Sequence, residues 1–210
     1  MSKETRGSDP QGVSRRGFLK GVGAGSAAAG FIGVGENTAQ AEGQDAPAIV
    51  GPGDGTYTLN IDGESKEVTA EPRATLLDVM RNRLDVTSAK KVCDRGTCGA
   101  CTIFIDGEPA YACSMLALEA IGHKITTIAS LGTPEMMSAL QKAFVKHDAQ
   151  QCGFCTPGFI VAATDLLNKN PNPTREQVRD GLGGNLCRCG TYVGVQEAVL
   201  EAAQSMKGGA

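Results

Sequence analysis

Tryptophan is absent from this sequence, and aromatic residues make up only 4% of its 210 residues. A folded core must therefore be built mainly from Val, Ile, Leu, Ala and Met. Hydrophobic residues of all kinds reach 41%, which is enough for one large domain or two small ones. An excess of charge of one sign is also absent, because 20 Lys and Arg stand against 23 Asp and Glu. This balance gives no electrostatic reason to expect a nucleic-acid partner.

Side chains that commonly carry acid–base or nucleophilic catalysis are scarce. The two histidines, His123 and His147, have no nucleophile paired with them in the sequence, and we interpret both as ordinary surface or core residues. The glycines Gly21, Gly23 and Gly25 do not follow a strand, so they do not indicate a nucleotide-binding loop. We therefore predict no catalytic residue on this chain.

No hydrophobic run is long enough to suggest a membrane anchor. A spanning helix needs about 20 strongly apolar residues, whereas the uncharged run Gly21–Gly35 is short and rich in Gly and Ala. Arg15-Arg16 and Phe18-Leu19-Lys20 precede this run, and Ala39-Gln40-Ala41 follows it. These parts make a secretory signal, and the paired arginines resemble the twin-arginine export signal of bacteria. We therefore expect residues 1–41 to be a cleaved twin-arginine signal peptide and the protein to be periplasmic, exported folded and without a transmembrane anchor.

Alternating hydrophobic residues from Tyr57 onward predict strands joined by hairpin turns at two Asp-Gly pairs. The expected strands are Tyr57–Ile61, Ser65–Val68, Ile103–Ile105, Ala110–Cys113 and Lys124–Ile128. Thr75, followed three residues later by Asp78, resembles a capping box and predicts the start of one helix. We therefore expect an α+β domain over residues 56–130, preceded by a linker of Gly, Pro and Asp over residues 42–55.

After Leu131 the hydrophobic residues recur with helical spacing. Start signals for three helices stand at Thr133-Pro134, at Thr156-Pro157 and at Thr174 with Gln177. A fourth stripe follows at Val195, Ala198, Val199 and Ala202. The sequence therefore predicts a helical domain over residues 131–206.

Four of the eight cysteines lie in the expected α+β domain, and their spacing is distinctive. They are Cys93, Cys98, Cys101 and Cys113. Cys-x4-Cys-x2-Cys with a more distant fourth cysteine is the spacing of plant-type [2Fe–2S] ferredoxins. Three thiolates wrap one side of a small cluster, and the second hairpin returns the chain to deliver the fourth. Gly96 and Gly99 lie between these ligands, where a Cβ would keep backbone N–H groups away from the sulfurs.

The other four cysteines form two close pairs, Cys152-x2-Cys155 and Cys187-x-Cys189, in the helical domain. Each pair precedes a predicted helix, so backbone N–H groups and the positive end of the helix dipole would face the thiolates. That setting favours the anionic thiol, which is the form that binds a metal. We expect these four cysteines to hold a second [2Fe–2S] cluster.

Three other uses of the cysteines remain open at this point. An exported chain with an even number of cysteines invites disulfides, although a pair separated by one residue, as in Cys187 and Cys189, is poorly placed to form one. Structural zinc suits the second group but not the spacing of the first. A redox-active dithiol at Cys152 and Cys155 would lack its usual βαβ setting. The sequence favours two [2Fe–2S] clusters over all three.

Three segments, read in order, resemble the iron–sulfur small subunit of the molybdenum hydroxylases, the xanthine dehydrogenase and aldehyde oxidoreductase family. The segments are CDRGTCGACTIFIDGEPAYAC, QCGFCTPGF and GNLCRCGTY, and the resemblance covers about residues 56–205. It implies an α+β fold in which a β-grasp [2Fe–2S] ferredoxin domain is followed by a four-helix [2Fe–2S]-binding domain.

The resemblance also implies partners and a reaction. A molybdopterin cofactor on a large partner subunit would lie beside the helical-domain cluster, where Gln151 and Cys189 match positions that contact the pterin. The other cluster would pass electrons outward to an FAD subunit, a cytochrome or another acceptor. The implied reaction is oxidative hydroxylation of an aldehyde or an N-heterocycle, with no substrate-transforming site on this chain.

The sequence departs from the family pattern after its seventh cysteine. Cys189 is followed by Gly190, Thr191 and Tyr192, whereas a Cys-Thr-Gly-Tyr order is common in the xanthine-oxidising branch; the order here resembles the aldehyde or isoquinoline oxidoreductase branch. These residues contain no molybdenum or flavin domain, so we expect catalysis on separate chains. The alternative interpretation is a free-standing electron shuttle with two clusters, but a shuttle would not need Gln151.

Overall fold

The computed structural model describes residues 51–207. The expected signal peptide, residues 1–41, and the linker up to residue 50 lie outside the described residues. Within residues 51–207, no helix is both long enough and apolar enough to cross a membrane.

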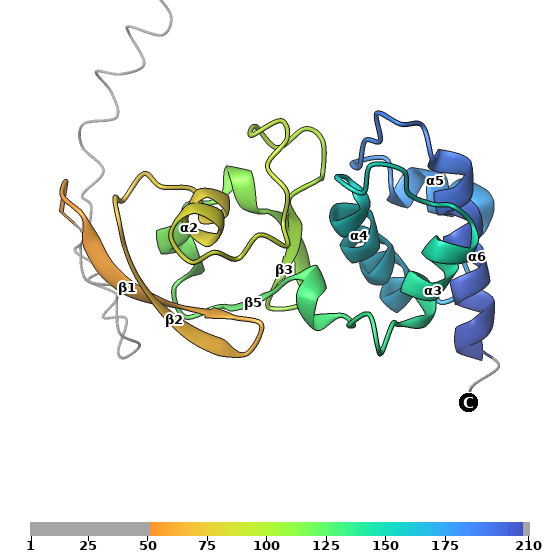
Figure 1. Cartoon of the computed structure of the whole chain (residues 1–210), viewed down its shortest axis with the longest axis horizontal. Helices are drawn as coiled ribbons and strands as arrows, with labels where there is room; N and C mark the ends of the chain where they lie inside the picture. The colour runs from red at the N-terminus through yellow and green to blue at the C-terminus, as the bar shows by residue number, and fades with distance from the viewer. Residues whose placement is uncertain (1–50, 208–210) are drawn as a thin grey trace, which may run out of the picture. The chain divides into compact units, whose positions relative to one another are not determined.

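Five strands form one mixed sheet in the order β2-β1-β5-β3-β4. Their bounds are β1 Gly55–Ile61, β2 Glu64–Ala70, β3 Thr102–Ile105, β4 Glu108–Tyr111 and β5 Lys124–Thr126. The antiparallel hairpins β1–β2 and β3–β4 lie on either side of β5, which pairs parallel with β1 and antiparallel with β3. The helix α2, Leu76–Asn82, lies against this sheet (Figure 1) and shares its buried core. The α+β fold predicted from the alternation is confirmed.

The helix α2 begins where the sequence predicts. The hydroxyl of Thr75 accepts a hydrogen bond from the backbone N–H of Asp78 at 3.2 Å, which satisfies one of the free donors at the helix start. Leu77 and Met80 are fully buried against the sheet. Leu84 lies beyond the end of the helix but still packs at the edge of the same core.

Two Asp-Gly turns hold the central strand β5 at both of its ends. Asp62 and Asp106 adopt left-handed backbone conformations, with φ of +53° and +51°, as tight hairpin turns require. The carboxylate of Asp62 accepts hydrogen bonds from the N–H and the hydroxyl of Thr127, both at 2.7 Å. The carboxylate of Asp106 accepts the N–H of Lys124 at 2.7 Å. The turns predicted to make hairpins therefore also fix a third strand.

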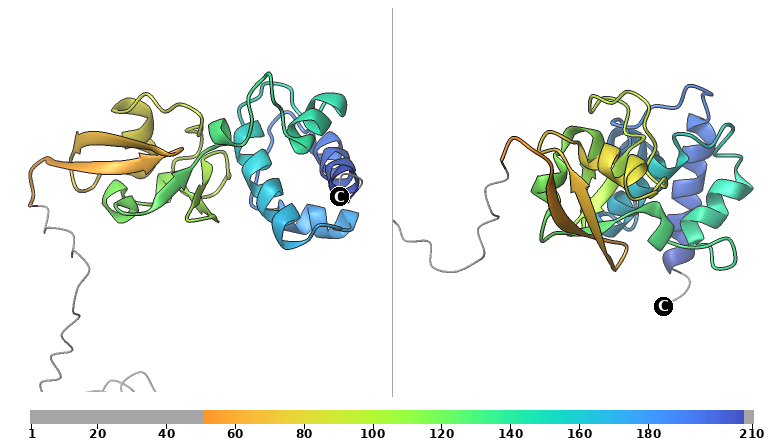
Figure 2. Two further views of the ribbon diagram at one scale, coloured as in Figure 1. Left: turned by 90° about the horizontal axis from the view of Figure 1, so that it is seen from below. Right: turned by 60° about the vertical axis from the view of Figure 1, so that its left-hand side comes forward.

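Four helices follow the sheet and enclose a second hydrophobic core (Figure 2). Their bounds are α3 Ala139–Lys146, α4 Thr156–Lys169, α5 Arg175–Gly181 and α6 Tyr192–Lys207. The start predicted at Thr174 is confirmed, because Thr174 and Gln177 exchange backbone and side-chain hydrogen bonds as a capping box. The start predicted at Thr156 is also confirmed, with Cys155 as the capping position.

The third helix begins later than expected, so the prediction of a start at Thr133 is wrong. The helix α3 follows Ser138, whose hydroxyl accepts the N–H of Gln141 at 3.2 Å while the Gln141 side chain accepts the N–H of Ser138 at 2.8 Å. This reciprocal pair satisfies two donors at once. Thr133 instead closes a turn with Met136, whose side chain is 76% exposed.

Both histidines serve the fold, as expected. His123 contacts the carboxylate of Asp106 in the second Asp-Gly turn, and His147 contacts the carboxylate of Glu201 at 2.7 Å, joining α3 to α6. A hydrogen bond from Lys146, and a smaller contribution from His147, hold the pKa of Glu201 below its usual value.

Replacement of Asp62 by alanine should weaken the fold more than replacement of Asp106. Thr127 is fully buried, so Asp62→Ala leaves two donors without a partner and forces alanine into a left-handed conformation. We expect a loss of about 2–4 kcal/mol in the free energy of unfolding, measured by urea denaturation. Asp106→Ala puts alanine in the same left-handed conformation but leaves only donors that remain in contact with water, so it should cost about 1–2 kcal/mol.

Asp62→Asn is the matched control, since asparagine tolerates the same backbone conformation and keeps one acceptor oxygen. It should fall between the wild type and Asp62→Ala. Equal losses for Asp62→Ala and Asp106→Ala would contradict the greater role of the buried turn.

Candidate functional site

All eight cysteines lie in the described part of the chain, and none of them forms a disulfide. Their thiols instead contact one another within the two groups that the spacing suggests. In the first group Cys93 contacts Cys98 and Cys101 contacts Cys113. In the second group Cys152 contacts Cys189 and Cys155 contacts Cys187.

The first group lies on the loop before β3 and on the short turn after β4. The loop carries Cys93, Cys98 and Cys101, and the hairpin β3–β4 returns the chain so that Cys113 faces them. The backbone N–H of Gly96 donates to the sulfur of Cys113 at 3.2 Å, and Gly96 has φ +69°. Such N–H···S bonds stabilise anionic sulfur. The reason predicted for a glycine at position 96 is therefore supported by its geometry.

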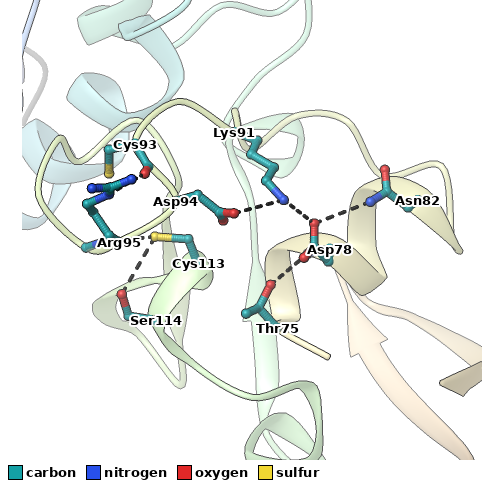
Figure 3. A network of polar contacts seen from close by, with 10 residues as sticks. Thr75, Asp78, Asn82, Lys91, Cys93, Asp94, Arg95, Cys113 and Ser114 are labelled. Atoms are coloured by element: carbon teal, nitrogen blue, oxygen red, sulfur yellow. Dashed lines mark hydrogen bonds and ion pairs between the residues drawn. The ribbon is translucent and has the colours of Figure 1, made fainter. Parts of the chain in front are cut away.

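A lysine ties this loop to the helix α2 (Figure 3). The ammonium group of Lys91 lies 2.7 Å from the carboxylate of Asp78 on α2 and 3.0 Å from that of Asp94 on the loop. Its hydrogen bonds with Asp78 and Asp94 hold the pKa of Lys91 above its usual value. Arg95 donates to the carbonyl of Cys93 at 3.1 Å, so charged side chains hold the exposed end of the loop.

The second group is formed where α4 and α6 begin. Cys155 is the residue that caps α4, and Cys187 and Cys189 lie just before Tyr192, the first residue of α6. Cys152 and Cys189 are exposed, whereas Cys187 is buried. The predicted placement of both pairs at helix starts is confirmed, and one side of the group faces solvent.

The two groups meet through backbone contacts that spacing does not reveal. The N–H of Leu186 donates to the carbonyl of Cys98 at 3.0 Å, and the side-chain amide of Asn185 donates to the carbonyl of Gly99 at 3.0 Å. A Cβ at Gly99 would lie 2.6 Å from the carbonyl oxygen of Gly184. A Cβ at Gly158 on α4 would likewise collide with the carbonyl of Gly99. Glycine at 99 is thus required by this close approach and by its left-handed backbone conformation, with φ +69°.

A cavity of about 400 Å³ opens between the two cysteine loops. Cys98 and Ala100 line one side of it, and Cys152, Cys155 and Cys187 line the other. Within the described residues, no three Cys, His, Asp or Glu side chains are spaced to hold a single metal ion. A two-iron cluster does not need such a group, because its four cysteines are divided between two irons. Four thiols in two contacting pairs therefore fit a [2Fe–2S] cluster in each group.

Burial and hydrogen bonds act in opposite directions on the thiols. Burial, with a smaller contribution from neighbouring cysteines, raises the pKa of Cys101 to about 12 and that of Cys155 to about 12. Burial also acts to raise the pKa of Cys93, but hydrogen bonds from Thr97 and Arg95 outweigh it and lower the value to about 6. Burial also acts to raise the pKa of Cys187, but hydrogen bonds from Thr191 outweigh it and lower the value to about 7. Each group thus contains a thiol whose pKa lies close to neutral pH, Cys93 in the first and Cys187 in the second.

Alkylation of the metal-free chain should reveal this difference. The pKa of Cys93 is lowered, so its reactive thiolate is present above pH 6 and is lost as the pH falls through that value. The rate for Cys93 should therefore be flat from pH 7 to 8.5 and should fall about tenfold per unit below pH 6. Mass spectrometry of iodoacetamide-labelled peptides measures this rate for each cysteine.

Cys101 provides the internal comparison, because its raised pKa keeps it a thiol over the whole range. Its rate should stay low and keep rising with pH. A rate for Cys93 that still rises tenfold between pH 7 and 8 would contradict the lowered pKa.

Two family models match this part of the chain. One, described as a 2Fe-2S iron-sulfur cluster binding domain, matches residues 55–156. The other, described as a [2Fe-2S] binding domain, matches residues 127–200. Each match contains one of the two cysteine groups, apart from Cys152 and Cys155, which lie in both.

Curated relatives and solved structures agree with these matches. The nicotinate dehydrogenase small FeS subunit of Eubacterium barkeri is 42% identical over 149 residues, which are 71% of this chain and 95% of that protein. The nicotine 6-hydroxylase small subunit of Paenarthrobacter nicotinovorans is 45% identical over 144 residues, 69% of this chain and 87% of that protein.

Among solved structures, a chain of quinoline 2-oxidoreductase from Pseudomonas putida 86 has a TM-score of 0.70 at 39% identity, over 74% of this chain and 98% of that one. The aldehyde oxidoreductase of Desulfovibrio desulfuricans has a TM-score of 0.69 at 42% identity, over 73% of this chain but only 17% of its own much longer chain. With the order of the cysteine motifs and the two cores, these likenesses place the chain in one family: it belongs to the [2Fe–2S] small subunits of the molybdenum hydroxylases, which are oxidoreductases.

Proposed function

We propose that this chain carries electrons from a molybdopterin centre on a large partner subunit, through two [2Fe–2S] clusters, to an FAD subunit or another acceptor. Cys93, Cys98, Cys101 and Cys113 would hold one cluster, and Cys152, Cys155, Cys187 and Cys189 the other. The observation that carries the proposal is the contact between the two groups. The carbonyl of Cys98 accepts the N–H of Leu186, the residue next to Cys187.

That contact supplies a short route between the clusters. The route runs from the sulfur of Cys98 through its own backbone, across one hydrogen bond of 3.0 Å, and through Leu186 to the sulfur of Cys187. Such a route has one non-covalent step. The protein supplies positions, hydrogen bonds and shielding from water, and the clusters supply the ability to accept one electron at a time.

The unequal exposure of the two groups supports a direction for this route. Cys98, Cys101 and Cys113 are buried, whereas Cys152 and Cys189 are exposed. Gln151 is exposed beside Cys152. We propose that this exposed side faces the pterin, with Gln151 and Cys189 in contact with it, so that the helical-domain cluster receives electrons first.

Exposed hydrophobic side chains favour a subunit over a free-standing shuttle. Val92, Phe154 and Leu186 are 57%, 51% and 54% exposed, and all three line the cavity between the cysteine loops. Apolar residues grouped in this way around a redox site are typical of a surface that a partner covers. A free-standing shuttle, which contacts its partners only briefly, has less need of exposed apolar residues around its redox site.

The names of the relatives suggest the substrate class. Relatives are named for nicotinate, for nicotine and, in the aldehyde oxidoreductases, for aldehydes. We propose an N-heterocycle or an aldehyde as the substrate of the complex. The twin-arginine pattern at Arg15-Arg16 further leads us to propose that the assembled complex is exported to the periplasm.

Co-purification tests the proposed function directly. A tagged chain, isolated from the periplasmic fraction of native cells, should bring a large subunit that contains molybdenum. It should contain four irons and four labile sulfides per copy of this chain. A chain that is isolated alone, brown but free of molybdenum, would support the electron shuttle instead. A colourless chain would contradict both interpretations.

Serine substitutions test the division of the cysteines. Cys98→Ser should abolish one of two EPR signals of the reduced complex and leave the other, because Cys98 contacts cysteines of its own group. Cys155→Ser should remove the opposite signal. Loss of both signals in either variant, with the fold intact by circular dichroism, would contradict the division into four and four.

A further inference from the structure

One ligand sulfur in the second group has a hydroxyl beside it. The side-chain oxygen of Thr191 lies 3.2 Å from the sulfur of Cys187. The carbonyl of Thr191 accepts the N–H of Val195 at 3.0 Å, so Thr191 stands at the start of α6 and its position is set by that helix. A thiolate sulfur only accepts hydrogen bonds, so the hydroxyl must donate when Cys187 binds iron.

The neighbouring residues make this hydroxyl a suitable donor. The backbone N–H of Cys187 is already used, because it donates to the hydroxyl of Tyr192 at 2.8 Å. The Tyr192 ring packs edge-on against Phe159, with the ring centres 6.2 Å apart. The backbone of Cys187 is therefore anchored to α6 through Tyr192, and its sulfur is left facing Thr191.

The order of residues after Cys189 explains why the threonine stands at 191. Gly190 has φ +82°, a left-handed conformation in which a β-branched residue is strained. With glycine at 190, the threonine is free to take an ordinary backbone conformation one position later. There its hydroxyl reaches Cys187, four residues earlier in the chain. The Gly-Thr order is thus tied to a contact with a ligand.

We propose that Thr191 raises the reduction potential of the helical-domain cluster through its hydrogen bond to Cys187, an inference that rests on the proposed function. Reduction adds one negative charge to the cluster, and part of that charge lies on the ligand sulfurs. A hydroxyl that donates to a sulfur stabilises the reduced form more than the oxidised form. The bond therefore favours transfer of an electron from the pterin side onto this cluster.

The first group has different hydroxyl donors beside its sulfurs. The hydroxyl of Ser114 lies 3.7 Å from the sulfur of Cys113 (Figure 3), which is longer than the Thr191 contact. A longer hydrogen bond stabilises charge less. The sulfur of Cys93 also accepts hydrogen bonds from the side chain and the backbone N–H of Thr97. Each cluster thus has hydroxyl donors of its own, and Thr191 contacts a ligand of the helical-domain cluster alone.

A redox titration of the intact complex, followed by EPR, tests this role. Thr191→Val removes the hydroxyl and keeps the branched side chain, so the midpoint potential of one signal should become more negative. That signal should be the one that Cys155→Ser abolishes. The other signal should keep its wild-type midpoint, because none of its ligands contacts Thr191.

Three further variants separate the hydrogen bond from packing. Thr191→Ser keeps the hydroxyl and should restore the wild-type midpoint. Thr191→Ala removes the hydroxyl without adding a methyl group, and it should show the same negative shift. It serves as the second test in case valine hinders insertion of the cluster. Thr164→Val makes the same chemical change on α4, where the hydroxyl donates to the carbonyl of Ile160, and should move neither signal.

The proposal is overturned if Thr191→Val and Thr191→Ala both keep the wild-type midpoint, or if Thr191→Ser shifts it as far as they do. Equal shifts of both signals would also overturn it, since they indicate a general change of structure. The wild-type titration decides the proposed function separately, because a wild-type complex that lacks two cluster signals would fail before any variant is compared.

Discussion

Backbone groups of the two cysteine loops touch one another, and the remaining structure depends on this contact. The backbone N–H of Leu186 donates to the carbonyl of Cys98, and the side-chain amide of Asn185 donates to the carbonyl of the next residue, Gly99. Backbones come this close only where side chains are missing, and Gly99 and Gly158 have no room for a Cβ. Two small cores with separate cysteine groups are joined at the point where electrons would cross.

The elements around the contact hold each loop by a different means. In the sheet half, the Lys91 ammonium group links the loop to α2, and two Asp-Gly turns fix β5 beside β3. In the helical half, the cysteines are held by the starts of α4 and α6. Ion pairs on an exposed loop are individually weak, so the buried core beneath α2 contributes most to the position of the first group. The second group instead depends directly on its helices.

Exposure and hydrogen bonding give the two groups different roles in the proposed function. The first group is largely enclosed, with backbone N–H groups donating to the sulfurs of Cys93 and Cys113. The second presents Cys152 and Cys189 to the outside and keeps Cys187 buried beside Thr191. An exposed side suits contact with a partner's cofactor, and a hydroxyl at the buried ligand suits adjustment of the potential.

The sequence by itself determined the α+β fold, two of the four helix starts after the sheet and the family, because these depend on local spacing and on order along the chain. It predicted the wrong start for α3, since Thr133-Pro134 and Ser138 with Gln141 are both acceptable starts and only packing chooses between them. It also identified the eight cysteines and their division into two groups. Only the tertiary structure decided that Asn185 and Gly158 meet Gly99, that Cys152 and Cys189 are exposed, and that Thr191 faces Cys187. Those features depend on how closely segments that are far apart in the sequence approach one another in the fold, and the spacing of residues along the chain does not show that distance.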